Sequence, residues 1–208
     1  MNFYENYILP YLIHWACSIK PIMYQRKKLI PMAKGTVLEV GIGTGLNLPF
    51  YDLNKINKVI GLEPSKKMHT KANETARRSN VSLELIDRYA EDIPLDDDSV
   101  DTIVVTYTLC SINETDNALK ELHRVLKNDG FLIFCEHGLS PDEKVISWQN
   151  KINPYWEIIA GGCNLNKNIP EILNNNKFEI ENLETMYLPS IPKFFGYNYF
   201  GKARIVNE

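Results

Sequence analysis

The chain has 208 residues, enough for one ordinary domain that buries a core without disulfides or structural metals. Its 44% hydrophobic and 24% charged residues are typical of a globular protein, and its net charge of −3 gives no basic field that would favour nucleic acid. Its four cysteines form no C-x-x-C pair, which argues against a zinc knuckle and fits a reduced compartment. We therefore expect a single cytoplasmic domain over residues 1–208, with no metal, no nucleic acid and no obligate protein partner.

The N-terminal residues 1–34 are predicted to form two helical pieces with breaks at their prolines. Their apolar face carries Tyr11, Trp15 and Ile19 and must be buried against something. We expect this segment to be a lid that closes over the substrate side of a ligand pocket. The alternative is peripheral contact with a membrane surface, because basic residues follow the aromatic ones. The basic run at 26–28 is expected on a solvated helix face.

The segment around which the fold is organised is TVLEVGIGTG, residues 36–45. It begins as a strand, turns through Gly41, Gly43 and Gly45, and is expected to lead into a helix within 46–56. A strand, a glycine-rich turn and a helix N-terminus together form a nucleotide cradle. The glycines let the chain turn sharply and let a ligand approach the backbone.

The spacing of the glycines in this turn narrows the choice of ligand. A dinucleotide fingerprint has its third glycine one position later, where this chain has Leu46, and Glu39 stands two residues before the first glycine. A carboxylate at that point suits a cation better than a pyrophosphate. The pattern therefore favours S-adenosylmethionine, which carries a sulfonium and an ammonium group, over a dinucleotide.

A second acid stands where a nucleoside needs it. The strand at 58–62 ends at Glu63, which lies 22 residues past Gly41, the offset that places a carboxylate on the ribose hydroxyls. Pro64 and Ser65 follow, and Ser65 is a suitable N-cap for a helix over residues 66–79. Met68 in its first turn either covers the adenine or packs in the core, and the sequence leaves both open.

The rest of the chain continues the alternation of strands and helices. Further strands are predicted at 81–86, 100–107 and 131–135, with a helix at 114–126. This alternation predicts a doubly wound parallel sheet whose ligands bind at the carboxyl ends of its strands. A helix interrupted near Pro154 is then expected within 140–160, followed by an antiparallel hairpin of strands 178–188 and 196–206 with a bulge or bend at Gly201.

Four stretches, LEVGIGTG, GLEPS, YAEDIPLDDDSVD and ELHRVLKNDGFLIFCEHG, resemble the type 11 group of class I S-adenosylmethionine-dependent methyltransferases. The resemblance implies a Rossmann-like seven-stranded sheet with an antiparallel last strand, and S-adenosylmethionine as cofactor. It divides the domain into the N-terminal lid, a cofactor-binding core at 35–138, and acceptor-side helices with a hairpin at 139–208. The group often has aspartate where this chain has Tyr89, so the contact expected of that aspartate with the adenine does not carry over.

The same resemblance implies a set of cofactor contacts. Glu39 and the backbone of the three glycines would hold the methionine end, and Glu63 would hold the ribose. Ala90 and Glu91 would lie at the adenine edge, Thr106 would face the methionine moiety, and Leu109 completes the expected cofactor-binding residues.

A closer resemblance is to the methyltransferase-like seven group of alkyl thiol methyltransferases. It rests on LCSI at 109–112, CEHG at 135–138 and the aromatic segment at 148–165. Animal members of that group have a longer hydrophobic N-terminal anchor, which we do not expect here, so membrane residence is not carried over. The resemblance implies methyl transfer to a small apolar acceptor such as a thiol. The alternatives are a phospholipid amine or a quinone or phenol precursor.

A thiol or phenol acceptor must lose a proton before it accepts the methyl group. His137, just beyond the fifth strand, is our candidate catalytic base, and the alternative is a histidine that only bonds a loop carbonyl. Cys110 and Cys163 are expected to be wall residues. Two other functions were weighed, a non-catalytic cofactor-binding module and an NAD-dependent oxidoreductase, and Leu46 with Glu39 argues against the oxidoreductase.

Overall fold

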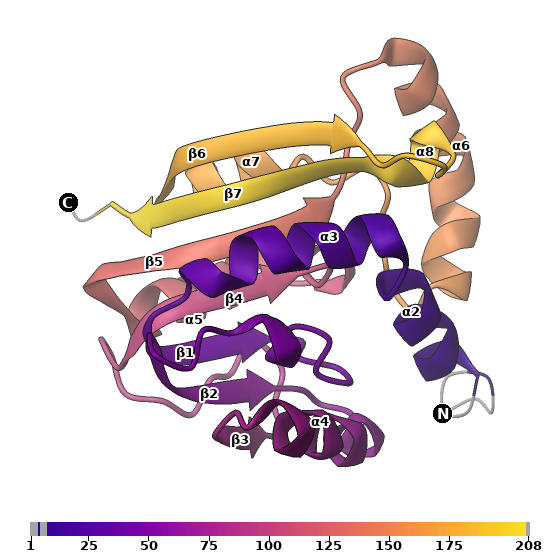
Figure 1. Ribbon diagram of the computed structural model, residues 1–208. Helices are drawn as coiled ribbons and strands as arrows, with labels where there is room; N and C mark the ends of the chain where they lie inside the picture. Colours follow the sequence, from indigo (N-terminus) through magenta and orange to yellow (C-terminus); the bar gives the residue numbers. More distant parts are fainter. Residues whose placement is uncertain (1–3, 5–7, 207–208) are drawn as a thin grey trace.

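The computed structural model describes residue 4 and residues 8–206, which form one seven-stranded sheet in the order β3-β2-β1-β4-β5-β7-β6 (Figure 1). The strands are β1 Gly35–Val40, β2 Ile56–Leu62, β3 Leu83–Ile86, β4 Val100–Thr106, β5 Leu126–His137, β6 Phe178–Tyr187 and β7 Tyr197–Ile205. Strands β1 to β5 pair in parallel, whereas β7 is antiparallel to both of its neighbours, β5 and β6. The predicted mostly parallel sheet with an antiparallel last strand is confirmed.

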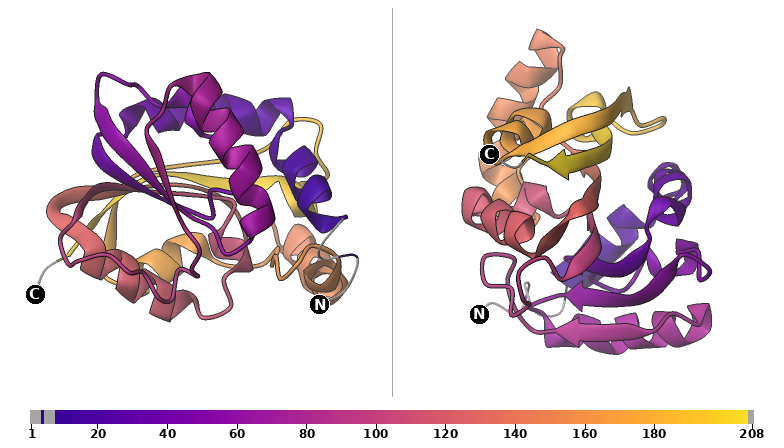
Figure 2. Two further views of the ribbon diagram at one scale, coloured as in Figure 1. Left: turned by 90° about the horizontal axis from the view of Figure 1, so that it is seen from below. Right: turned by 90° about the vertical axis from the view of Figure 1, so that its left-hand side faces the viewer.

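Helices cover both faces of the sheet (Figure 2). They are α2 Leu9–Cys17, α3 Lys20–Leu29, α4 Lys66–Ser79, α5 Thr115–Val125, α6 Glu143–Ile159, α7 Ile169–Asn175 and α8 Lys193–Gly196, with 3₁₀ turns η1 Ile30–Met32, η2 Leu48–Phe50 and η3 Leu109–Ser111. Helices α3 and α4 lie on one face and α5 and α7 on the other, while α2 and α6 stand at the carboxyl ends of the parallel strands.

The core follows the hydrophobic periodicity of the sequence. Helix α5 buries Ala118, Leu119, Leu122 and Val125 against the sheet, a stripe at helical spacing. Strand β4 is buried along almost its whole length, because helices cover it from both sides. A second cluster, which includes Leu29 and Ile30, fills the opposite face. Among the described helices, none is both long enough and apolar enough to cross a bilayer.

Three local expectations were wrong. The helix expected within 46–56 is only the single turn η2, which contains a proline without an N–H. The side chains of Asn47 and Tyr51, on either side of this turn, face Glu39. Helix α6 is not interrupted at Pro154. Two buried amide side chains of α6 bond neighbouring segments and offset the lost hydrogen bond: Gln149 donates to the Gly138 carbonyl, and Asn153 accepts from the Leu165 N–H.

The third concerns Gly201. The register shift lies on the partner strand β6, between Ile180 and Asn182, and not at the glycine itself. Gly201 is required for another reason, since a Cβ at this position would lie 1.9 Å from the Asn182 carbonyl oxygen. The short helices α7 and α8 were not predicted, because segments of 7 and 4 residues carry too little periodicity.

Candidate active site

The glycine turn after β1 has the backbone geometry that its sequence predicts. Gly41, Gly43 and Gly45 all have positive φ, at +63°, +55° and +79°. At Gly41 a Cβ would lie 2.6 Å from the Thr108 hydroxyl oxygen, so a side chain is excluded there by space as well as by conformation. The turn therefore presents bare backbone at the carboxyl end of the sheet.

A buried polar network lies directly below the turn. Glu39 is 2% exposed and accepts hydrogen bonds from Asn47 Nδ2 at 3.0 Å and from the Tyr51 hydroxyl at 2.7 Å. Burial raises the pKa of Glu39 to about 7, against the opposing effects of Tyr51, Arg26 and Asn47. Thr106 at the end of β4 joins the network, because its hydroxyl accepts from Asn47 Nδ2 at 3.0 Å and from Arg26 Nη1 at 2.7 Å.

Arg26 corrects the expectation that the basic run at 26–28 lies on a solvated face. Its side chain is 4% exposed, and Nη1 also donates to Asn47 Oδ1 at 2.7 Å. Its Nε is buried without a partner among the described residues. Helical spacing could have identified it, since Ile22, Gln25, Arg26 and Leu29 form the buried stripe of α3. A guanidinium with a spare donor beside a carboxylate fits a zwitterionic ligand.

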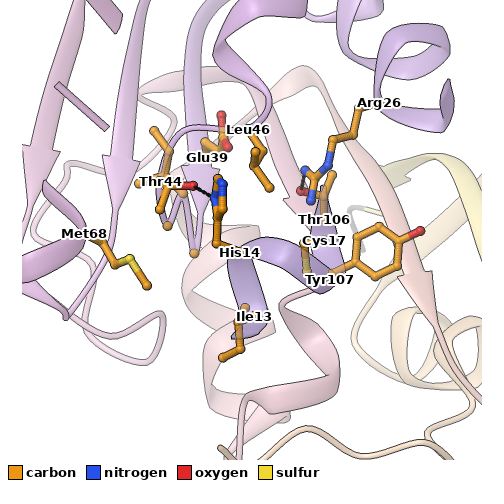
Figure 3. A pocket seen from close by; sticks show the side chains of 13 residues that line it. Ile13, His14, Cys17, Arg26, Glu39, Thr44, Leu46, Met68, Thr106 and Tyr107 are labelled. Carbon is orange, nitrogen blue, oxygen red and sulfur yellow. Dashed lines mark hydrogen bonds between the residues drawn. The ribbon is translucent and has the colours of Figure 1, made fainter. Parts of the chain in front are cut away.

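The network forms one wall of a small pocket of about 70 Å³ at the glycine turn (Figure 3). We call it the glycine-turn pocket, and its lining is Ile13, His14, Cys17, Arg26, Glu39, Gly41, Ile42, Gly43, Thr44, Leu46, Met68, Thr106 and Tyr107. Helix α2 closes it, with His14 Nδ1 placed 2.7 Å from the Thr44 hydroxyl oxygen. Helix α2 thus lies over the glycine turn.

Five of the residues predicted to bind cofactor line this pocket, and the other seven do not. Those inside are Glu39, Gly41, Gly43, Met68 and Thr106; those outside are Gly45, Glu63, Pro64, Ser65, Ala90, Glu91 and Leu109. Ala90 and Leu109 are core residues, because the loops that carry them turn inward. Ser65 is the N-cap residue of α4 as predicted, but its hydroxyl makes no capping bond.

Glu63 lies at the edge of the turn. Its Oε2 accepts from the Gly43 N–H at 3.0 Å and its Oε1 from the Ser65 N–H at 2.9 Å. Burial raises its pKa, and the two backbone N–H groups oppose that rise. The carboxylate therefore connects the glycine turn to the start of α4, and each oxygen keeps a further lone pair for a ligand hydroxyl.

A second, larger pocket of about 380 Å³ adjoins the first and is lined mostly by apolar groups. We call it the apolar pocket, and its lining is Ile13, Trp15, Ala16, Cys17, Ile19, Ile22, Tyr107, Cys110, Ser111, His137, Trp156, Ala160, Cys163, Leu165, Leu188, Ile191, Pro192, Phe195 and Asn198. The predicted lid residues Trp15 and Ile19 belong to it. Tyr11 does not, because it is 61% exposed and its ring lies under the ammonium group of Lys71.

The two pockets share Ile13, Cys17 and Tyr107. Tyr107 has a φ of +55°, a conformation that costs energy for a bulky residue and is often held at functional sites. Its hydroxyl donates to Asn198 Oδ1 at 2.6 Å and its ring lies 5.5 Å from the Arg26 guanidinium carbon. The sequence places Tyr107 at the carboxyl end of a predicted strand, but its conformation and partners depend on contacts with distant segments.

His137 faces the apolar pocket and lies in contact with a protein sulfur. Its Nε2 is 3.1 Å from Cys163 Sγ, and its ring stacks on Tyr107 with centroids 6.3 Å apart. Its Nδ1 is buried and has no partner among the described residues. The imidazole is thus at the predicted place, but both of its nitrogens are out of direct contact with the glycine turn.

Comparison with known proteins is consistent with this geometry. A methyltransferase domain model matches residues 38–134. The thiol S-methyltransferase TMT1B of Rattus norvegicus is 33% identical over 77% of this chain and 69% of its own length, and the human TMT1B is 30% identical over 86% and 77%. A solved S-adenosylmethionine-dependent methyltransferase from Aquifex aeolicus has the same fold, with a TM-score of 0.64 at 21% identity over 95% of this chain and 98% of that one.

The doubly wound sheet, the glycine turn with its buried carboxylate and the adjoining apolar pocket define a class I methyltransferase that uses S-adenosylmethionine. The residues present fit that cofactor, because Glu39 offers a negative partner for its cationic end and Arg26 Nε is a buried donor that no described residue accepts from. The chain belongs to the methyltransferase family that includes the TMT1 proteins.

Proposed function

We propose that this protein transfers a methyl group from S-adenosylmethionine to the sulfur of a small apolar thiol. The observation that carries the proposal is the apolar pocket, which meets the glycine-turn pocket at Tyr107. A pocket with so few polar groups selects acceptors by shape and desolvation. Relatives named thiol S-methyltransferases, at about 30% identity, support the choice of sulfur.

When bound, the cofactor supplies a methyl group already activated by its sulfonium, so the protein's main contribution is alignment and exclusion of water. We infer that Glu39 faces the ammonium group, that Arg26 Nε binds the carboxylate of the methionine moiety, and that Glu63 accepts from the ribose hydroxyls. Helix α2 lines one side of the glycine-turn pocket, and we infer that it moves when the cofactor enters. His14 on Thr44 is the contact that this movement breaks.

The acceptor enters beside the shared residues. Ile19 and Trp156 form part of the wall, and Tyr107 separates the two pockets. A thiol held there points its sulfur toward the glycine turn, and its alkyl group displaces water from the aromatic wall. Closure of α2 over both pockets then excludes solvent from the displacement.

A panel of labelled-methyl assays tests the proposal. The wild-type protein is incubated with labelled cofactor and, separately, with an apolar alkyl thiol, a phospholipid amine and a phenol. We expect turnover with the thiol to exceed that with the other acceptors. Higher turnover with the amine or the phenol would replace the proposed acceptor.

A matched pair of variants checks the location of the acceptor. Ile19→Asn introduces a polar group into the pocket wall and should raise KM for the thiol by about tenfold, the effect of removing a few buried methylene groups from contact. Ile158→Asn makes the same change on the exposed face of α6, where the side chain is 79% exposed, and should leave KM unchanged.

A further inference from the structure

Two thiols and an imidazole converge at the end of the apolar pocket. Cys110 belongs to η3, His137 ends β5, and Cys163 lies in the loop after α6. Their Sγ, imidazole nitrogen and Sγ atoms all lie within 4.8 Å of one another. We propose that Cys110, His137 and Cys163 form a binding site for a thiophilic divalent cation, with Zn²⁺ as the metal that suits the ligand set best.

The geometry is close to that of a zinc site. Zinc bonds to thiolate sulfur at about 2.3 Å and to imidazole nitrogen at about 2.1 Å, which places neighbouring ligands of a tetrahedral site about 3.5–3.8 Å apart. Here the Cys163 Sγ to His137 Nε2 distance is 3.1 Å, and the widest separation in the cluster is below 4.8 Å. Shifts of about 1 Å or less, within reach of side-chain rotation, would complete the site.

The backbone around Cys110 is held in place by a buried carboxylate and a partly buried ammonium group. The Glu136 carboxylate is fully buried and accepts from the Thr108 N–H at 2.7 Å and from the Cys110 N–H at 3.5 Å. Lys167 Nζ donates to the carbonyl oxygens of Leu109 at 2.9 Å and Ile112 at 2.6 Å. Four hydrogen bonds thus fix the turn η3 and the residue on each side of it, which is the kind of support that metal ligands need.

The loop that carries Cys163 is hydrogen-bonded to the turn that carries Cys110. The Asn164 N–H donates to the Cys110 carbonyl at 2.9 Å, so the loop that carries Cys163 is attached directly to η3. The Trp156 indole N–H approaches the Cys163 sulfur at 3.4 Å, a contact that also suits a metal-bound thiolate. The cluster is therefore preorganised by the backbone hydrogen bond between its two loops and by the contact of Trp156 with the Cys163 sulfur.

The charge balance favours a soft divalent cation. Two thiolates and a neutral imidazole neutralise a 2+ ion, which limits the cost of burying it beside an apolar pocket. Magnesium and calcium prefer oxygen ligands, and none of the three residues offers one. Three protein ligands leave a fourth position open, and all three residues line the apolar pocket, so that position faces the pocket.

The site has a consequence for the acceptor that rests on the proposed function. A thiol that coordinates the cation loses its proton to solvent and remains as thiolate. Its sulfur lone pair attacks the methyl carbon, a new C–S bond forms, and the C–S bond of the sulfonium breaks with its electron pair left on the cofactor sulfur. His137 would then be a metal ligand and not the general base that the sequence suggested.

Spacing along the sequence could not reveal this cluster. Its members are separated by 27 and 26 residues and lie on three different elements, whereas sequence patterns for zinc rely on pairs two to four residues apart. The expectation of no metal site came from that absence of pairs. Only the folded sheet brings the end of β5 beside the two loops.

Metal binding to the purified full chain tests the site directly. After chelation and desalting, the protein is titrated with Zn²⁺ and separately with Co²⁺. We expect one equivalent to bind and a thiolate-to-cobalt charge-transfer band to appear. Cys163→Ser and Cys110→Ser should each weaken binding by about a hundredfold or more, whereas Cys135→Ala, a change at a buried cysteine outside the cluster, should not.

A measurement on the wild-type chain keeps the test decisive if a variant fails to fold. Zn²⁺ should protect Cys110 and Cys163 from alkylation, as read by peptide mass mapping, while Cys17 is labelled at the same rate with and without metal. Binding that is equal in Cys163→Ser and wild type, or labelling of Cys110 and Cys163 that Zn²⁺ does not slow, would overturn the site. Thiol turnover in chelated protein without metal would leave the proposed function standing and remove the metal from it. Stoichiometric Zn²⁺ binding with no thiol turnover would leave the metal site standing and overturn the proposed thiol methyl transfer.

Discussion

The glycine-turn pocket is enclosed by a buried carboxylate, a buried guanidinium and bare backbone, whereas the apolar pocket beside it is enclosed by aromatic rings, aliphatic side chains and thiols. In the first, Glu39, Asn47 and Arg26 are already bonded to one another, so their orientation is fixed before a ligand arrives. In the second, few polar groups set an orientation. Under the proposed function, this difference means that the cofactor is recognised by charge and the acceptor by fit and loss of water.

The two pockets nevertheless share a cover. Ile13 and Cys17 of α2 line both, so one helix controls access to a charged site and to an apolar one. Under the proposed function, such a cover couples cofactor and acceptor binding, because a bound cofactor changes where α2 can rest.

Removal of α2 should have the largest effect. Deleting residues 1–19 removes the shared wall and leaves α3 with Arg26 in place. We expect methyl transfer to become undetectable and cofactor affinity to fall by about tenfold, since water then reaches the transfer site. Isothermal calorimetry and a labelled-methyl assay measure the two effects, with circular dichroism as the check on folding. A folded, truncated protein with normal turnover would show that α2 is not a lid, and liposome flotation would then test the membrane alternative.

Replacement of Arg26 should act mainly on the glycine-turn pocket. In Arg26→Met the methylene stem is kept while the bonds to Asn47 and Thr106 are lost, and Glu39 is left without its cationic neighbour. We expect cofactor binding to weaken by about 2–3 kcal/mol, the scale of hydrogen bonds to charged groups. Lys27→Met is the matched control, because Lys27 is the next residue on α3 and is exposed. Equal affinities in the two variants would remove Arg26 from the site.

Glu63→Ala should weaken cofactor binding by about 1.5–3 kcal/mol, through loss of the carboxylate expected to face the ribose. The structure adds a complication, because the same carboxylate accepts from the Gly43 and Ser65 N–H groups. Binding of the cofactor and of its 2′,3′-dideoxy analogue should therefore be compared by calorimetry. If the substitution reduces the affinities of both nucleosides equally, Glu63 supports the turn and does not contact the ribose. Glu84→Ala, at an exposed ion pair with Lys58, serves as control.

The sequence predicted the glycine turn better than the apolar pocket, and the reason is physical. The glycine turn is a local feature, since strand, turn and Glu39 lie within ten residues and their conformations follow from residue type. The apolar pocket is assembled from segments between Ile13 and Asn198, so its shape depends on tertiary packing. Its residues are ordinary apolar side chains that no local pattern separates from core residues.

Arg26 and Asn47 mark the limit of local patterns within the cofactor side as well. The charge run at 26–28 predicts solvent exposure if it is considered by composition alone. Arg26 lies on the same face of α3 as Ile22 and Leu29, so helical periodicity would have predicted that it points inward. Periodicity alone does not show which groups a buried guanidinium contacts. Asn47 lies in a segment that the sequence predicts to be helical. Its side chain points inward because only the short turn η2 forms there.

The smallest effect should come from the proton on Glu39. Because burial raises the pKa of this carboxyl to about 7, it is about half protonated near neutral pH in the free protein. A cationic ligand beside it lowers that pKa, so binding releases a proton and affinity rises with pH. For one such group we expect affinity to rise about fivefold from pH 6 to 7 and about twofold from pH 7 to 8. Calorimetry in buffers of different ionisation enthalpy measures the proton released. In Glu39→Gln the released proton and this pH dependence should both disappear, while titration of the cofactor's own amine affects the two proteins equally. If the affinity of the wild type changes with pH as that of Glu39→Gln does, the cationic end of the cofactor does not lie beside Glu39. The assignment of the charged pocket to the cofactor and of the apolar pocket to the acceptor would then be wrong.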